Sequence, residues 1–127
     1  MRYLCNGFSL AMPRDPNTKP IPYALTEQEF VNLVHHGNFK PIIGHKQLAE
    51  CLTRLTGKNI PFNRRGITLN YEDEILVVYL TGRLPENPSY VEYKGRLNYA
   101  YVRFEKQSQL EIEKTLNNLD KITMEAI

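Results

Sequence analysis

The stretch FKPIIGHKQLAECLTRLTG, residues 39–57, contains the change of pattern that decides the fold class. Its first part, residues 39–43, is short and apolar, which is typical of a buried strand. Gly57 ends the second part, whose apolar residues recur at helical spacing: Leu48, Ala49, Leu52 and Leu55. A strand that leads directly into a helix is typical of an α/β fold, and it places His45 at or near the start of that helix.

Strand and helix patterns alternate on both sides of this stretch. Thr26 and Glu29 have the spacing of a capping box, which predicts a helix that ends at Gly37. The segment ILVVYLT, residues 75–81, is almost continuously apolar, as expected of a central strand covered on both faces. Apolar or alternating patterns predict further strands at residues 2–5, 67–69 and 99–104.

We therefore expect a single α/β domain with a mixed central sheet of about five strands flanked by helices. A chain of 127 residues can bury a sufficient core without metal ions or disulfides. The segment PRDPNTKPIP, residues 13–22, is expected to be a proline-rich loop. Residues 105–127 carry an amphipathic pattern, and we expect them to add a C-terminal helical extension to a domain of residues 1–104.

Charge and composition limit the class of function. The formal net charge is +2, which argues against a groove for long DNA or RNA but allows a small anionic ligand. No apolar run approaches the length of a membrane span, and the N-terminus lacks a signal-peptide pattern, so we expect no membrane partner. Cys5 and Cys51 have the pattern of buried residues in a reducing cytoplasm. The histidines and cysteines give no zinc spacing, so we expect neither a metal nor another cofactor.

Polar groups gather in four segments at predicted strand ends or helix starts, which is where open α/β sheets bind ligands. The segments are Asn6 to Ser9, Gly44 to Lys46, Asn63 to Gly66 and Gly82 to Glu86. A helix start offers free backbone N–H groups and a positive potential, so His45 is a candidate acid beside a bound phosphate.

Each segment also has a purely structural interpretation. His45 could cap its helix or pack in the core, and Asn6 with Gly7 could form only a turn. Arg64 and Arg65 could form a solvated turn. Arg83 and Glu86 could form a surface ion pair.

The combination indicates cleavage of an RNA-type phosphodiester without a metal. The ribose 2′-hydroxyl of the substrate can itself attack the adjacent phosphorus. The protein then has to align the groups, stabilise the charge on the phosphorane and protonate the leaving 5′-oxygen. One histidine is sufficient for the last step.

Four motifs resemble the viral ring nucleases, small anti-CRISPR proteins that degrade cyclic tetraadenylate, the second messenger of type III CRISPR defence. They are YLCNGFSL, IIGHKQLAECLTRLTG, PFNRRGITL and YEDEILVVYLTGRLPE, and they occur in the family's order between Arg2 and Phe104. The resemblance implies a homodimer that holds the cyclic nucleotide across the subunit interface. It also implies a location in the cytoplasm of an infected prokaryotic host.

The resemblance assigns roles to residues. The catalytic residues it implies are His45 as general acid, Arg83 as charge stabiliser, and Glu86 on the same loop. Tyr79 stands where many relatives have glutamine, so that ligand contact is either lost or made by a phenol. The remaining ligand-binding positions are Asn6, Ser9, Gly44, Arg64 and Ile67. Gly44 is expected to allow a tight turn and to leave room for a phosphate.

The leading hypothesis is thus a metal-independent ring nuclease that yields linear di-adenylates ending in a 2′,3′-cyclic phosphate. The alternative is a non-catalytic protein that sequesters the cyclic nucleotide. A third interpretation is a viral interaction protein that binds a partner through the C-terminal helix.

Overall fold

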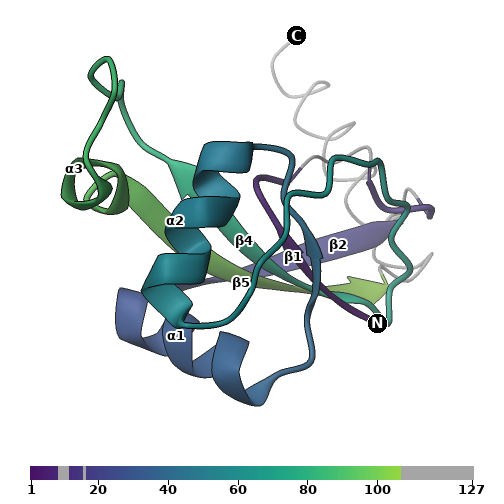
Figure 1. Ribbon diagram of the computed structural model, residues 1–127. Coiled ribbons are helices and arrows are strands. Elements are labelled where there is room, and N and C mark those ends of the chain that lie inside the picture. The colour runs from purple at the N-terminus through teal and green to yellow at the C-terminus, as the bar shows by residue number, and fades with distance from the viewer. Residues whose placement is uncertain (9–11, 16, 107–127) are drawn as a thin grey trace, which may run out of the picture.

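One mixed sheet organises the chain, whose computed structural model describes residues 1–8, 12–15 and 17–106 (Figure 1). Its strands are β1 Arg2–Cys5, β2 Thr18–Leu25, β3 Lys40–Ile42, β4 Glu74–Leu80 and β5 Leu97–Lys106. They lie in the order β2-β5-β4-β1-β3. β1 is parallel to β3 and β4, whereas β5 is antiparallel to β4 and β2. The predicted single domain with a mixed five-stranded sheet is confirmed.

Three helices complete the described domain: α1 Glu27–His36, α2 Lys46–Thr56 and α3 Tyr90–Lys94. In Figure 1, α1 and α2 lie across one face of the sheet. The predicted capping box of α1 is present, since the Glu29 N–H donates to the Thr26 hydroxyl and the Thr26 N–H donates to the Glu29 carboxylate. α2 ends at Gly57, whose φ of 73° lies in the left-handed region that glycine adopts without strain.

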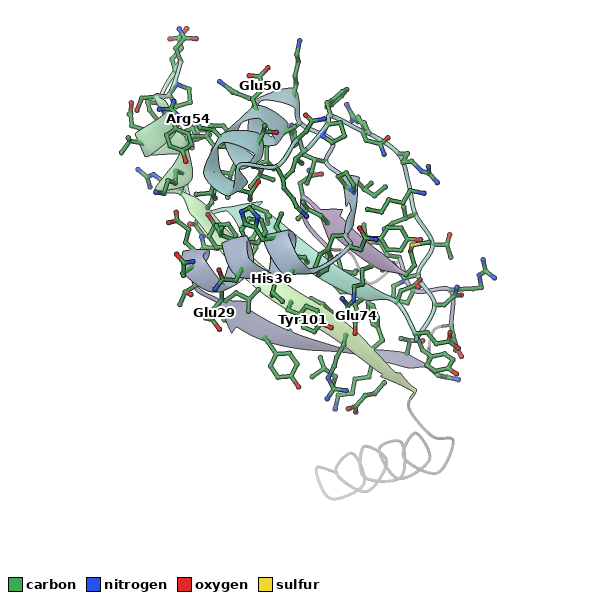
Figure 2. All side chains as sticks on the ribbon, turned by 60° about the horizontal axis from the view of Figure 1, so that its bottom comes forward. Glu29, His36, Glu50, Arg54, Glu74 and Tyr101 are labelled. Atoms are coloured by element: carbon green, nitrogen blue, oxygen red, sulfur yellow. The ribbon has the colours of Figure 1, made fainter. Side chains whose placement is uncertain are left out.

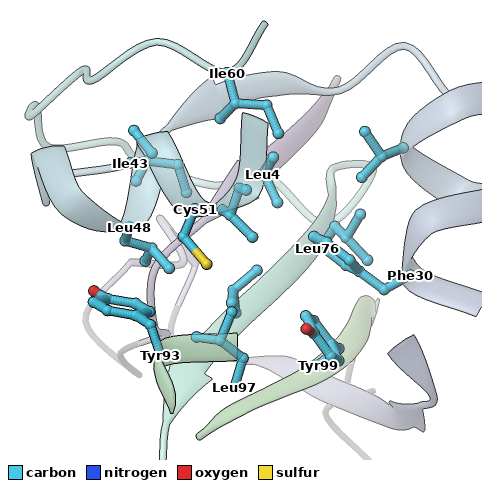
Figure 3. Packing of buried hydrophobic residues seen from close by; sticks show 14 residues of the cluster. Leu4, Phe30, Ile43, Leu48, Cys51, Ile60, Leu76, Tyr93, Leu97 and Tyr99 are labelled. Atoms are coloured by element: carbon cyan, nitrogen blue, oxygen red, sulfur yellow. The ribbon is translucent and has the colours of Figure 1, made fainter. Parts of the chain in front are cut away.

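The main core lies between the helices and the sheet (Figure 3). Its central contact is a stack of Phe30 on Tyr99, with ring centroids 4.4 Å apart. β4 contributes side chains to two apolar clusters. Leu76 and Val78 face the helices, while Ile75 and Val77 join a second cluster on the opposite face. The prediction that β4 is a central strand covered on both faces is therefore confirmed.

The end of the sheet where β4 begins is held by a polar cluster. The Arg2 Nε donates to Glu74 Oε2 over 2.6 Å, and Figure 2 shows Glu74 beside Tyr101 of the neighbouring strand. Burial, followed by the hydrogen bond to Glu74, raises the pKa of Tyr101 to about 12. Although burial opposes it, hydrogen bonds from Tyr101 and Arg2 lower the pKa of Glu74. These contacts tie β1, β4 and β5 together far from the polar strand ends described below.

The prediction of a proline-rich loop at residues 13–22 is wrong from Thr18 onward. Thr18–Leu25 form β2, which pairs with β5 along its whole length. Backbone N–H groups of alternate residues point to the same side of a strand, so Pro20 and Pro22 both lack the donor that would face away from β5. An edge strand tolerates prolines at such positions.

Two other local predictions need correction. Instead of a strand at residues 67–69, only Leu69 makes a bridge, with Pro13. The short helix α3 was not expected; its N-cap is Ser89, in a capping box with Glu92. Residues 107–127 of the predicted C-terminal extension lie outside the described residues, whereas Glu105 and Lys106 belong to β5. Within the described part of the chain, no helix has both the length and the apolar character needed to cross a bilayer.

Candidate functional site

A pocket of about 220 Å³ lies where the chain leaves the carboxyl ends of β1 and β3. Four of the predicted site residues meet there: Asn6, Gly44, His45 and Arg64. The other residues that line it are Ile42, Asn63 and Arg65. Parallel strands bring their carboxyl ends to the same end of a sheet, which explains why segments distant in sequence converge.

His45 is the N-cap residue of α2, and its side chain makes no capping hydrogen bond. Its backbone carbonyl accepts the first helical hydrogen bond, from the Ala49 N–H over 3.0 Å. The side chain is exposed at the pocket. The imidazole is thus neither a helix cap nor a core group, which leaves it accessible to a ligand.

Gly44 lies against two other predicted site residues. Its N–H donates to Asn6 Oδ1 over 2.8 Å. A Cβ atom at Gly44 would lie 3.4 Å from Arg64 Cγ and 3.6 Å from Asn6 Oδ1. Gly44 is not among the glycines with positive φ, so the turn itself does not require glycine. The missing side chain instead leaves space between the backbone and Arg64.

The pocket is suited to an anion. Arg64 and Arg65 supply two positive charges, and the described residues that line it include no carboxylate. The start of α2 adds backbone N–H donors and the positive end of the helix dipole. Arginine is the side chain best matched to phosphate oxygens, because its planar group can donate two parallel hydrogen bonds.

Neither cysteine is an activated nucleophile. Burial raises the pKa of the Cys5 thiol to about 12, and Cys5 immediately precedes Asn6. Burial, as the largest cause, also raises the pKa of Cys51. Thiols with raised pKa values stay protonated at neutral pH and react slowly. Among residues 1–8, 12–15 and 17–106, no group of three or more His, Cys, Asp or Glu side chains is arranged to hold a metal ion.

Arg83 and Glu86 lie outside this pocket, on the loop between β4 and α3 that protrudes from the domain in Figure 1. Both side chains are exposed, and within the described chain they form no ion pair with each other or with another residue. The surface ion pair considered from the sequence is therefore absent there. Gly82 begins the loop with a φ of 76°, a conformation that disfavours any residue with a Cβ atom.

Three further predicted ligand-binding residues lie elsewhere or are not described. Tyr79 lines a separate pocket of about 360 Å³ together with Gly7 and Phe8. Ile67 packs, partly buried, against the second apolar cluster. Ser9 lies outside the described residues.

Asn63 and Arg65 line the pocket although the sequence did not single them out as ligand-binding residues. Both belong to the polar run Asn63 to Gly66, so the sequence contained a general signal for each of them. Asn63 contacts backbone atoms of the β3 segment, and no spacing pattern reveals such contacts.

Three comparisons place the chain among viral proteins. A family model described as STIV B116-like matches residues 2–94. "Uncharacterized protein 26" of Sulfolobus islandicus filamentous virus (isolate Iceland/Hveragerdi) is 33% identical over 88 residues, which are 68% of this chain and 73% of that protein. The solved structure of B116 of Sulfolobus turreted icosahedral virus is 26% identical, with a TM-score of 0.69, and covers 80% of this chain and 97% of its own.

Proposed function

Because the chain belongs to the STIV B116-like family of viral proteins, and because its pocket joins a free histidine to two arginines, we propose that it is a ring nuclease. It cleaves cyclic tetraadenylate and so switches off type III CRISPR defence in the cytoplasm of the infected prokaryotic host. One observation carries the proposal: the His45 imidazole is uncommitted at a helix start whose N–H groups and neighbouring arginines favour a phosphate.

The proposed reaction uses the substrate's own 2′-hydroxyl as nucleophile. Its oxygen bonds to the adjacent phosphorus while the hydroxyl proton passes to solvent water, and the bond from phosphorus to the 5′-oxygen breaks. Arg64, the N–H groups of α2 and Arg83 of the exposed loop stabilise the negative charge on the phosphorane. His45 donates a proton to the leaving 5′-oxygen. Two such cleavages convert one ring into two linear di-adenylates, each ending in a 2′,3′-cyclic phosphate.

Two copies of the chain complete the proposed site. One copy offers one His45, whereas cyclic tetraadenylate has equivalent linkages on opposite sides of the ring. A two-fold dimer would present two histidines to opposite phosphates. The exposed loop with Arg83 and Glu86 would then close over the ligand at the subunit interface. The expected stoichiometry is one cyclic nucleotide for two chains.

Incubation with cyclic tetraadenylate tests the activity directly. We expect mass spectrometry to show linear di-adenylates with cyclic phosphate ends, in equal yield with and without a chelator, because the 2′-hydroxyl needs no metal-activated water. Cleavage that requires added magnesium or manganese would exclude this chemistry.

The alternative function is sequestration of the cyclic nucleotide without cleavage. It is favoured by the absence of Arg83 and Glu86 from the residues that line the pocket in their own chain, since the pocket residues could bind a phosphate without them. Tight binding by calorimetry, with intact ligand after long incubation, would establish this alternative in place of the enzyme.

Arg83→Ala tests whether the protruding loop takes part. We expect weaker binding and a single-turnover rate lower by about a hundredfold, the scale seen when one donor to a developing oxyanion is lost. The matched control is Arg103→Ala, which removes an exposed arginine from β5 beside β2 and should change neither quantity. An unchanged rate with weakened binding alone would restrict Arg83 to holding the ground state.

A further inference from the structure

We propose that Asn6 and Asn63 are positioning residues that hold the junction between β3 and α2 from two sides and thereby fix His45. Neither acts on the reacting atoms in this role. The consequence for catalysis rests on the proposed function, whereas the clamp itself concerns the free protein. We call the two asparagines, together with the junction residues 41–45 that they hold, the junction clamp.

Asn6 holds the junction from the end of β1. Gly44 N–H is a donor, so the atom of Asn6 that lies 2.8 Å from it has to be the amide oxygen. The bond is partly buried and joins residues 38 positions apart, so it is a tertiary contact and not part of a local turn. With its oxygen used in this way, the Asn6 amide has its N–H₂ group on the other branch, where it can donate to a ligand in the pocket that Asn6 lines.

Asn63 holds the same junction from the opposite side. Its backbone N–H donates to the Ile43 carbonyl over 2.8 Å, and its side-chain amide donates to the Pro41 carbonyl over 3.1 Å. These two bonds occupy carbonyls on the outer side of β3, which is an edge strand. Ile43 is thereby fixed one residue before Gly44 and two before His45.

The clamp matters because no hydrogen bond or ion pair from the described residues restrains the His45 side chain. His45 makes no side-chain cap bond, so the backbone of the preceding residues sets the point from which its imidazole reaches the pocket. Small displacements of a catalytic group away from its productive geometry reduce rates strongly. A clamp on both sides of Gly44 keeps His45 at a constant distance from Arg64, whose side chain lies against Gly44.

The first test uses the free protein and does not depend on any activity. Hydrogen exchange of the Gly44 amide is followed by NMR in the parent, Asn6→Ala and Asn6→Asp. Aspartate keeps an acceptor oxygen, so we expect it to retain the protection that alanine loses. We expect exchange at Gly44 to be at least about tenfold faster in Asn6→Ala, the scale of one hydrogen bond. Equal exchange in the parent and Asn6→Ala would overturn the clamp.

The second test separates positioning from binding and from stability. Asn63→Ala is compared with Asn59→Ala, an exposed asparagine of the preceding loop that does not line the pocket. For cyclic tetraadenylate we expect Asn63→Ala to lower the single-turnover rate by about ten- to a hundredfold at saturating ligand, with little change in Kd. The Asn59→Ala control should match the parent.

The outcomes distinguish the two proposals. A rate loss in Asn63→Ala that only follows the loss of folded protein, monitored by thermal unfolding, would reduce Asn63 to a structural residue and overturn its positioning role. If the parent protein leaves the ring intact, the proposed function fails, and the Gly44 exchange rates in the parent, Asn6→Ala and Asn63→Ala still decide the clamp. Faster exchange in both variants supports it; unchanged exchange in either refutes it.

Discussion

His45→Ala is expected to slow cleavage of cyclic tetraadenylate by about a hundredfold to ten-thousandfold while leaving its affinity nearly unchanged. In the proposed reaction the leaving 5′-oxygen needs a proton in the transition state, and the imidazole is the group proposed to supply it. The proposed binding depends instead on Arg64, Arg65 and the helix start, which the substitution leaves in place. Single-turnover rates with the ligand pre-bound measure the chemical step directly.

The stability of the His45→Ala variant should match that of the parent, because the His45 side chain makes no capping hydrogen bond. The matched control is His35→Ala, which removes an exposed histidine from the last turn of α1, away from the pocket. Both variants should unfold at the parent's temperature, and only His45→Ala should lose activity. Equal single-turnover rates for His45→Ala and the parent would remove His45 from the mechanism.

Phe30→Ala should lower the free energy of unfolding by about 3–5 kcal/mol, the usual cost of removing a buried phenyl ring and leaving a cavity. Phe30 is 0% exposed and stacks on Tyr99 between α1 and β5. Both rings are surrounded by the main core, so collapse around the vacant volume is restricted. Urea or guanidinium unfolding curves, compared at equal slope, measure the loss.

Phe62→Ala is the matched control for this prediction, because Phe62 is a phenylalanine that is 52% exposed. Its substitution should cost less than about 1 kcal/mol, in line with ordinary surface changes. A cost for Phe30→Ala no greater than that for Phe62→Ala would mean that the contact between α1 and β5 contributes little to stability.

The sequence predicted those elements whose signals are local. The capping box of α1 and the apolar run of β4 depend on a few neighbouring residues, and both were located to within about one residue. β2 was missed because its strand conformation depends on pairing with β5, some eighty residues later in the chain, which local composition rich in proline obscured. The segment 67–69 has strand-forming residues, but among the described residues only Leu69 has a bridge partner. The residue pattern therefore predicted a strand where the structure has a single bridge.

The same difference between local and long-range signals explains which site residues could be predicted from the sequence. His45 was placed correctly at the start of α2 because a glycine and a helical pattern flank it in the sequence. The positions of Asn6 and Arg64 beside Gly44 follow from the order of the strands, which a single sequence does not reveal. Tyr79 and Val78 point to opposite faces of β4, and only the assembled sheet shows that Tyr79 faces a different pocket.

The prolines of β2 have a consequence for how two copies of this chain could associate. At one edge of the sheet, Pro20 and Pro22 offer no N–H groups to an incoming strand. At the other edge, Asn63 already occupies carbonyls of the β3 segment, and Phe62 bridges Ile43. A dimer that shares a cyclic ligand is therefore expected to meet through a face of the domain, because edge-to-edge joining into one continuous intermolecular sheet is disfavoured at both edges. The same two edges also disfavour growth into fibres by strand addition.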